Sequence, residues 1–150
     1  MISKYYTQKS KEYKPFKGDS QAHLIYRMER DIVGWAVNTH TKKADLQTVA
    51  DHACRKYYKV DPPEIKIVRR KGAPFGWAIH STIYLNALWH GDNMAVLLHE
   101  LAHHILEDEV DIEDHGPEFV SIYIDLLDKY KMMPRECMEL LCTKYGVSHV

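Results

Sequence analysis

The segment Val96–Leu106 constrains the fold of this chain most strongly, because it combines a helical apolar pattern with two histidines. His99 and His103 are four residues apart, so on a helix they share one face, with their Cβ atoms about 5–6 Å apart. That spacing allows both ring nitrogens to reach one zinc ion at about 2.0–2.1 Å. Apolar residues recur in this segment with the 3.6-residue period of a helix, which predicts that one side faces the core: Leu97, Leu98, Leu101, Ala102 and Ile105.

Glu100 completes the pattern H-E-x-x-H with these two histidines. Its carboxylate lies one residue beyond the first histidine and can reach a water molecule held at the metal. Zinc lowers the pKa of a bound water to about 7, so a carboxylate can accept its proton at neutral pH. The pattern therefore indicates metal-assisted hydrolysis. The alternative is a core helix in which both histidines are only hydrogen-bonded.

A catalytic zinc ion takes three protein ligands and keeps a fourth position for water, so a third ligand must follow. His115 comes 12 residues after His103 and directly precedes Gly116-Pro117, which is typical of a helix start. Imidazole suits zinc, which favours His115 as the third ligand. Four nearby acids are the alternatives: Asp111, Glu113, Asp114 and Glu118.

The two motifs, H-E-L-A-H at 99–103 and H-G-P-E-F at 115–119, together resemble the SprT-like, or Spartan-type, zinc metallopeptidases over about residues 80–130. The resemblance implies a zincin-like fold and one catalytic Zn²⁺ ion bound by His99, His103 and His115. It also implies that Glu100 is the general base for hydrolysis of peptide bonds in a protein or peptide substrate. Many SprT-like proteins continue into a zinc ribbon with paired C-x-x-C motifs. The three cysteines of this chain form no such pairs, so it resembles the short stand-alone bacterial and phage forms.

Composition is that of one globular domain over residues 18–150, with 45% apolar and 27% charged residues in the whole chain. A net charge of −1 gives no general attraction to nucleic acid or to an anionic membrane. We expect no membrane association, because no run of 18 apolar residues is present. An odd number of cysteines without framework spacing indicates a reducing cytoplasm. The resemblance to the short stand-alone forms implies a bacterial or phage-infected cell. Oligomeric state has no signal in the sequence.

Residues 1–17 form a separate basic arm, with five lysines, one glutamate and interspersed tyrosines. Such an arm can contact phosphates and stack on bases, although a solvated terminus is the simpler interpretation. The arm motivates an alternative function, a DNA-associated SprT-like protease that acts on DNA-bound proteins. A third alternative is a non-catalytic binding module stabilised by zinc.

The remaining pattern predicts an α+β fold with N-terminal helices, a small, mostly antiparallel three-stranded sheet, the histidine helix and C-terminal helices. One helix is expected from Asp19 or Ser20 to about Thr39, and a second over about Asp45–Tyr57. Strands are expected at Ile65–Val68 and over Trp77–Asn86, with a break near His80-Ser81, and a last helix at about Pro134–Tyr145.

Two further site predictions concern substrate and ligand support. We expect Ser81–Asn86 to be an exposed sheet edge that binds peptide as an added strand, with Thr82, Tyr84 and Asn86 contacting substrate. The alternative is a paired strand without a ligand role. Six carboxylates lie in the eight residues 107–114. One of them can orient a ligand imidazole through the ring nitrogen that does not bind the metal. The simpler interpretation, for most of these carboxylates, is a solvated loop.

Overall fold

The computed structural model describes residues 19–33 and 40–150, which belong to two compact units. One unit contains residues 40–108, and the other contains residues 19–33 and 109–150. Helices and a small sheet make up these ranges, which confirms the predicted α+β class. The basic arm at residues 1–17 lies outside the described residues.

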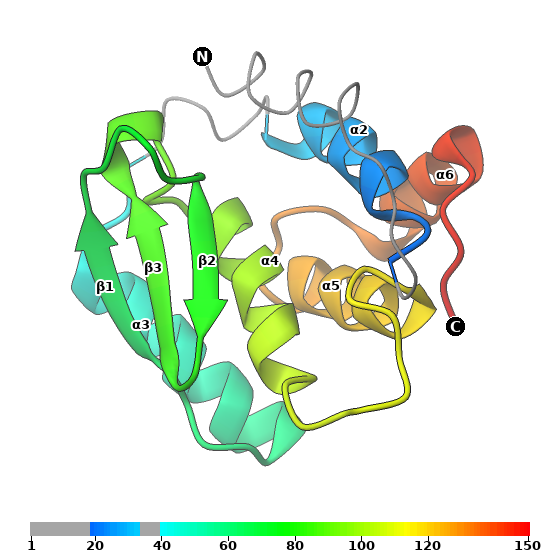
Figure 1. Cartoon of the computed structure of the whole chain (residues 1–150). Coiled ribbons are helices and arrows are strands. Elements are labelled where there is room, and N and C mark those ends of the chain that lie inside the picture. Colours follow the sequence, from blue (N-terminus) through cyan, green and yellow to red (C-terminus); the bar gives the residue numbers. More distant parts are fainter. Residues whose placement is uncertain (1–18, 34–39) are drawn as a thin grey trace. The chain divides into compact units, whose positions relative to one another are not determined.

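The unit of residues 40–108 contains the sheet. Its strands are β1 (Glu64–Val68), β2 (Gly76–Ile79) and β3 (Thr82–Asn86), and β3 is the middle strand. β1 runs parallel to β3 and β2 runs antiparallel to it, so the sheet is mixed (Figure 1). The expectation of a mostly antiparallel sheet is therefore wrong, since alternation shows that a strand is half-buried without showing the direction of its partners.

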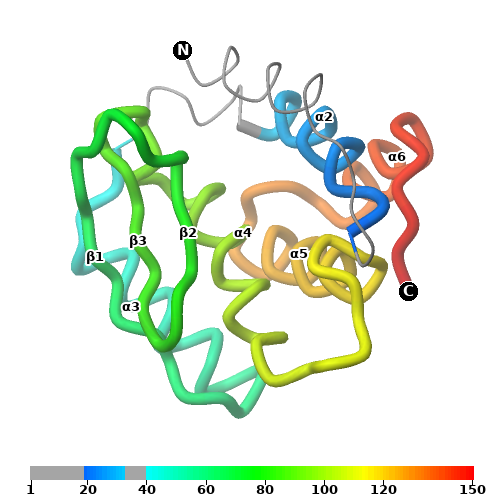
Figure 2. Tube along the Cα trace, in the orientation of Figure 1, coloured from blue at the N-terminus to red at the C-terminus, as the bar shows by residue number. Residues whose placement is uncertain are grey.

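The position of β3 also overturns a second expectation. Residues 81–86 were expected to form an exposed edge, but β3 is paired on both sides, from Thr82 to Asn86 against β1 and from Thr82 to Leu85 against β2. Ile83 and Leu85 are fully buried, as suits a central strand. The tight turn at residues 80–81 joins β2 to β3 as neighbours in the trace of Figure 2, which confirms the predicted break.

Helices α3 (Lys43–His52) and α4 (Met94–Ile105) pack against this sheet, α3 on β1 and α4 on β2 and β3. A π-helical turn, Ala53–Tyr58, extends α3 and ends at Lys59, whose φ is 55°. The predicted second helix is thus confirmed, with its last part more loosely wound. The core between helices and sheet is apolar and fully buried: Leu46, Ala50, Ile65, Ile83, Leu85, Leu97, Leu98 and Leu101.

Helix α4 is capped at its N-terminus by Asn93. The Asn93 side chain accepts a hydrogen bond from the Val96 backbone N–H at 3.0 Å, which satisfies one of the unpaired donors of the first turn. The side chain of the preceding residue, Asp92, contacts His40. Of the predicted apolar side, Leu97, Leu98, Leu101 and Ala102 are buried, and Ile105 is half-buried.

The other unit is helical, with α2 (Ala22–Val33), α5 (Pro117–Lys129) and α6 (Arg135–Tyr145). Helix α6 packs against both α2 and α5. Pro117 begins α5 and Gly146, with φ of 70°, ends α6, as the sequence predicts. The part of the predicted first helix at residues 34–39 lies outside the described residues. None of the helices within residues 19–33 and 40–150 has the length and apolar character needed to cross a bilayer.

Candidate metal centre

His99 and His103 lie together on α4. Their ring centroids are 5.0 Å apart with the ring planes at 65°, which confirms that the two imidazoles share one helix face. His99 is buried and His103 is half-buried. The leucines on the opposite side fix the helix in the core, so these rings are held by a rigid element.

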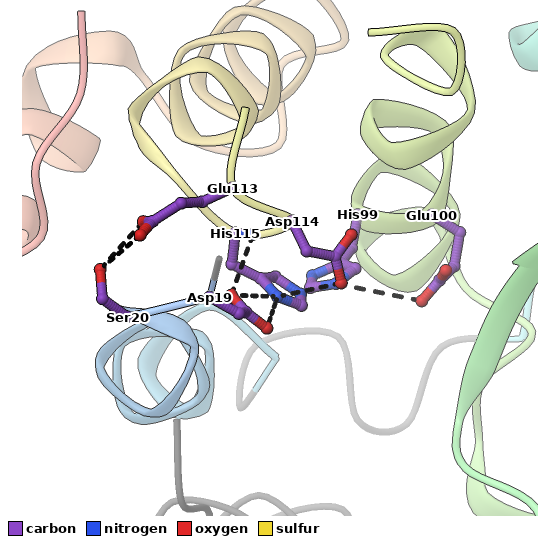
Figure 3. A network of polar contacts seen from close by, with 7 residues as sticks. All are labelled: Asp19, Ser20, His99, Glu100, Glu113, Asp114 and His115. Carbon is purple, nitrogen blue, oxygen red and sulfur yellow. Dashed lines mark hydrogen bonds and ion pairs between the residues drawn. The ribbon is translucent and has the colours of Figure 1, made fainter. Parts of the chain in front are cut away.

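Glu100 lies beside the first of these rings. Its Oε1 atom is 4.0 Å from Nε2 of His99, and the two side chains are only 11% and 8% exposed (Figure 3). The stem of Glu100 also packs closely against the start of β2. A Cβ atom at Gly76 would lie 3.2 Å from Cγ of Glu100 and 2.8 Å from Cγ1 of Val96, so this position has room only for glycine. Strand β2 therefore helps to place the carboxylate.

His115 lies in the other unit, just before α5, and is 5% exposed. Its ring Nδ1 is 3.2 Å from each carboxylate oxygen of Asp19, and its backbone N–H donates to Oδ1 of Asp19 at 3.1 Å (Figure 3). The rings of Tyr26 and Phe119 meet the imidazole edge-on, at centroid distances of 5.5 and 5.0 Å. The orientation of His115 is thus fixed by both polar and aromatic contacts.

Asp19 is a site residue that sequence reasoning missed, because it was considered only as a helix start. It precedes His115 by 96 residues, and no local pattern links the two positions. The carboxylate that orients a ligand imidazole was expected in residues 107–114. Of those, Asp114 lies 3.7 Å from Nδ1 of His115, but its side chain is 62% exposed.

The other proposed third ligands have different surroundings. Glu113 accepts hydrogen bonds from the Ser20 hydroxyl at 2.9 and 3.0 Å (Figure 3). Asp111 is exposed, and Glu118 is half-buried in the first turn of α5. Among these candidates within the unit, His115 is the buried one.

Another possible ligand group lies within this unit and includes Asp19 itself. One ligand atom each from Asp19, Asp114 and His115 lies within 4.8 Å of the others. In that arrangement Asp19 would itself bind a cation. If His115 instead binds a metal without Asp19, the Asp19 carboxylate orients the imidazole. A carboxylate on one ring nitrogen is the usual partner of a metal-binding histidine, which favours the orienting role.

His104 directly follows the second histidine of the motif. Its Nε2 atom lies 2.7 Å from the carbonyl oxygen of Asp61, so the ring connects α4 to the loop before β1. This contact is that of a structural histidine.

The residues expected to contact substrate lie on the middle strand of the sheet. Asn86 is fully buried, and its amide holds the loop after β1 by donating to the carbonyl oxygens of Arg70, Ala73 and Pro74. Tyr84 stacks on Trp77, and Thr82 is paired in the sheet. The edge position on which their proposed role depended does not exist.

Comparisons of the chain with protein-family models, with curated proteins and with solved structures found no match.

Proposed function

We propose that this protein is a zinc-dependent metallopeptidase of the SprT-like type, in which His99, His103 and His115 hold one Zn²⁺ ion. The observation that carries the proposal is the placement of two adjacent imidazoles and the Glu100 carboxylate on one buried helix. Each of the three imidazoles offers one ring nitrogen as a ligand atom. Within the other unit, the contact of Asp19 with Nδ1 supports Nε2 as the proposed metal-binding nitrogen of His115.

The donor set fits zinc, because imidazole nitrogens are among its preferred ligands and a helix at i, i+4 spacing presents two of them together. A bound zinc ion would polarise the scissile carbonyl and lower the pKa of a water molecule to about 7. Glu100 acts as general base, receives the proton of the attacking water and then delivers it to the leaving amine. Its closely packed stem restricts the carboxylate to the vicinity of His99.

The peptide substrate is proposed to bind along β2, which replaces β3 as the edge strand of the sheet. Within the described residues β2 pairs with β3 on one side only. The Asn86 N–H donates to the Phe75 carbonyl, so these two residues form a hydrogen-bonded pair of the antiparallel ladder. Hydrogen-bonded and non-hydrogen-bonded pairs alternate along such a ladder, so the next hydrogen-bonded residue of β2 is Trp77, and Gly76 and Ala78 do not bond to β3. The main-chain groups of Gly76 and Ala78 are therefore those that face the open edge. A peptide can add there as a strand through main-chain hydrogen bonds alone.

Replacing Ala78 with proline tests this binding mode. Proline removes the outward N–H and is tolerated on an edge strand, so Ala78→Pro should raise KM for peptides without changing zinc content. Ala78→Ser keeps the N–H and is the matched control. Unchanged kinetics in the proline variant would show that the β2 edge does not bind substrate.

The experiment for the activity itself uses casein, an unfolded protein, as the probe. Glu100→Gln should retain zinc and lower the cleavage rate by about 10²–10⁴-fold, because the general base is lost. His99→Asn should lose both this zinc ion and the activity. Glu107→Gln changes an exposed acid just beyond α4 and is the matched control. Full activity in Glu100→Gln would refute the mechanism, and zinc binding without any hydrolysis would favour a non-catalytic module.

A second candidate function, association with nucleic acid, has its own support on the outer face of the sheet. Trp77 and Tyr84 stack with ring centroids 5.0 Å apart and planes at 12°. The Arg70 guanidinium lies 5.7 and 5.9 Å from these two rings, and the Lys66 ammonium lies 6.0 Å from Tyr84. Sheet register places Lys66, Tyr84 and Trp77 in one row across three strands. Aromatic rings with adjacent cations are typical of single-strand binding sites.

This alternative is tested by titrating the protein with a fluorescent single-stranded oligonucleotide at two salt concentrations. Arg70→Ala should weaken binding and reduce its salt dependence, because one phosphate contact is lost. Arg55→Ala changes an exposed cation of the same unit, outside this row, and is the control. Equal affinities of the parent and Arg70→Ala would exclude the sheet face as a nucleic-acid site.

A further inference from the structure

A second pair of histidines, His40 and His90, lies in the unit of residues 40–108. The Nε2 atom of His40 is 3.3 Å from Nδ1 of His90, and the ring centroids are 5.1 Å apart. Two nitrogens that each lie 2.0–2.1 Å from one tetrahedral zinc ion are about 3.3–3.4 Å apart. The two rings thus have the separation that a shared metal ion requires.

Asp92 supports the first of these rings. Its carboxylate oxygens lie 2.9 and 3.0 Å from Nδ1 of His40, on the side of the ring away from His90. A carboxylate there accepts the Nδ1 proton and leaves Nε2 as the electron-pair donor. Metal-binding histidines almost always have such a partner on the other nitrogen, which fixes the tautomer and raises the basicity of the ligand.

The backbone holds the second ring in an unusual conformation. His90 has φ of 61° and ψ of 30°, a left-handed conformation that few residues other than glycine adopt. Its carbonyl accepts a hydrogen bond from the Asn93 side chain at 2.6 Å, and its N–H donates to Ala87. The Thr41 N–H donates to the Asp92 carbonyl at 2.9 Å, which ties the two segments together. Such strained positions are concentrated at functional sites.

We propose that His40 and His90 form a second metal site, which takes one borderline divalent cation such as Zn²⁺ or Cu²⁺, and that Asp92 orients His40. Two protein ligands leave positions for water or for a ligand from another molecule, and the His40 side chain is 54% exposed. The bound ion would fix the segment immediately before α4, which begins at Met94. The site does not depend on the proposed peptidase activity, because neither histidine belongs to the H-E-x-x-H motif.

The same separation is also that of a ring-to-ring hydrogen bond, in which one proton takes the place of the ion. Calorimetric titration of the metal-free protein with Zn²⁺ separates the two cases by counting ions. His40→Asn and His90→Asn should each bind one ion fewer than the parent. Asparagine tolerates a positive φ, so His90→Asn keeps the backbone conformation. Asp92→Asn should keep the ion with an affinity lowered by about 10–100-fold.

His80→Asn is the matched control, because His80 is an exposed histidine of the same unit that also has a positive φ, of 48°. It should bind as many ions as the parent. His99→Asn should lose a different ion, so failure of either site is seen separately. In the intact protein, the ring ¹⁵N resonances of His40 and His90 should shift when Zn²⁺ is added, which does not depend on any variant folding. Unchanged resonances, or equal ion counts in His40→Asn and His90→Asn, would overturn the proposal.

Discussion

Asp19 contacts both nitrogen-bearing groups of His115, the backbone N–H at 3.1 Å and ring Nδ1 at 3.2 Å. The pair is buried, so water competes little for either contact. A carboxylate on Nδ1 selects the tautomer in which Nε2 is the electron-pair donor. The contact therefore leaves Nε2 of His115 as the ring nitrogen that would bind the proposed metal ion.

Asp19→Ala should weaken zinc binding at the proposed catalytic site by about 10–100-fold, because the ring loses its orienting partner. Asp19→Asn keeps one acceptor oxygen and should have a smaller effect. Competition with a chromophoric chelator measures both affinities. Ser20→Ala is the control, since that hydroxyl contacts Glu113 in the same loop but not His115. Parent-like affinity in Asp19→Ala would show that the contact does not serve metal binding.

Gly76→Ala should destabilise the protein by about 1–3 kcal/mol and reduce activity, because the new methyl group meets Val96 and the stem of Glu100. Urea unfolding gives the first effect and the casein assay gives the second. Gly72→Ala is the matched control, as a Cβ atom there meets nothing within 4 Å. Equal stability and activity of the two variants would contradict close packing of β2 on Glu100, the proposed general base.

Asn86→Ala should cost about 2–4 kcal/mol of unfolding free energy, because the fully buried Asn86 side chain loses its part-buried hydrogen bonds with the main chain of Arg70, Ala73 and Pro74. KM for peptides should stay unchanged in the folded fraction, since β3 is the middle strand. Thr82→Ala shortens a half-buried side chain on the same strand and should change stability much less. A raised KM with parent-like stability would restore the substrate role that the sequence suggested for Asn86.

The sequence predicts what is encoded locally. The apolar period and the histidine spacing of α4 lie within one helix, so its existence, most of its buried side and the shared face of His99 and His103 were predictable. The same holds for Pro117 and Gly146 as helix ends. These features depend on contacts between residues a few positions apart.

Features that join distant segments were not predictable. The parallel pairing of β1 with β3 depends on how the chain crosses between them, and alternation in each strand is the same for either direction. The Asp19–His115 contact joins positions 96 residues apart, and an aspartate at a helix start is ordinarily a cap. The π-helical turn at Ala53–Tyr58 has likewise no period that the sequence reveals.

The cysteines give a prediction that depends mainly on burial. Burial raises the pKa of the Cys54 and Cys142 thiols to about 11, whereas Cys137 is exposed. Since the thiolate is the reactive form, only about 0.1% of a thiol with a pKa near 11 is reactive at pH 8. One thiol per chain should therefore react rapidly with Ellman's reagent in the folded protein, and three after unfolding. Cys137→Ser should abolish the rapid phase.

The buried thiols of Cys54 and Cys142 should react more slowly, at a rate that follows their ionisation. That rate should rise about tenfold per pH unit until the pH nears 11. Rapid reaction of two or three thiols in the folded parent would show that the helices bearing Cys54 and Cys142 open readily.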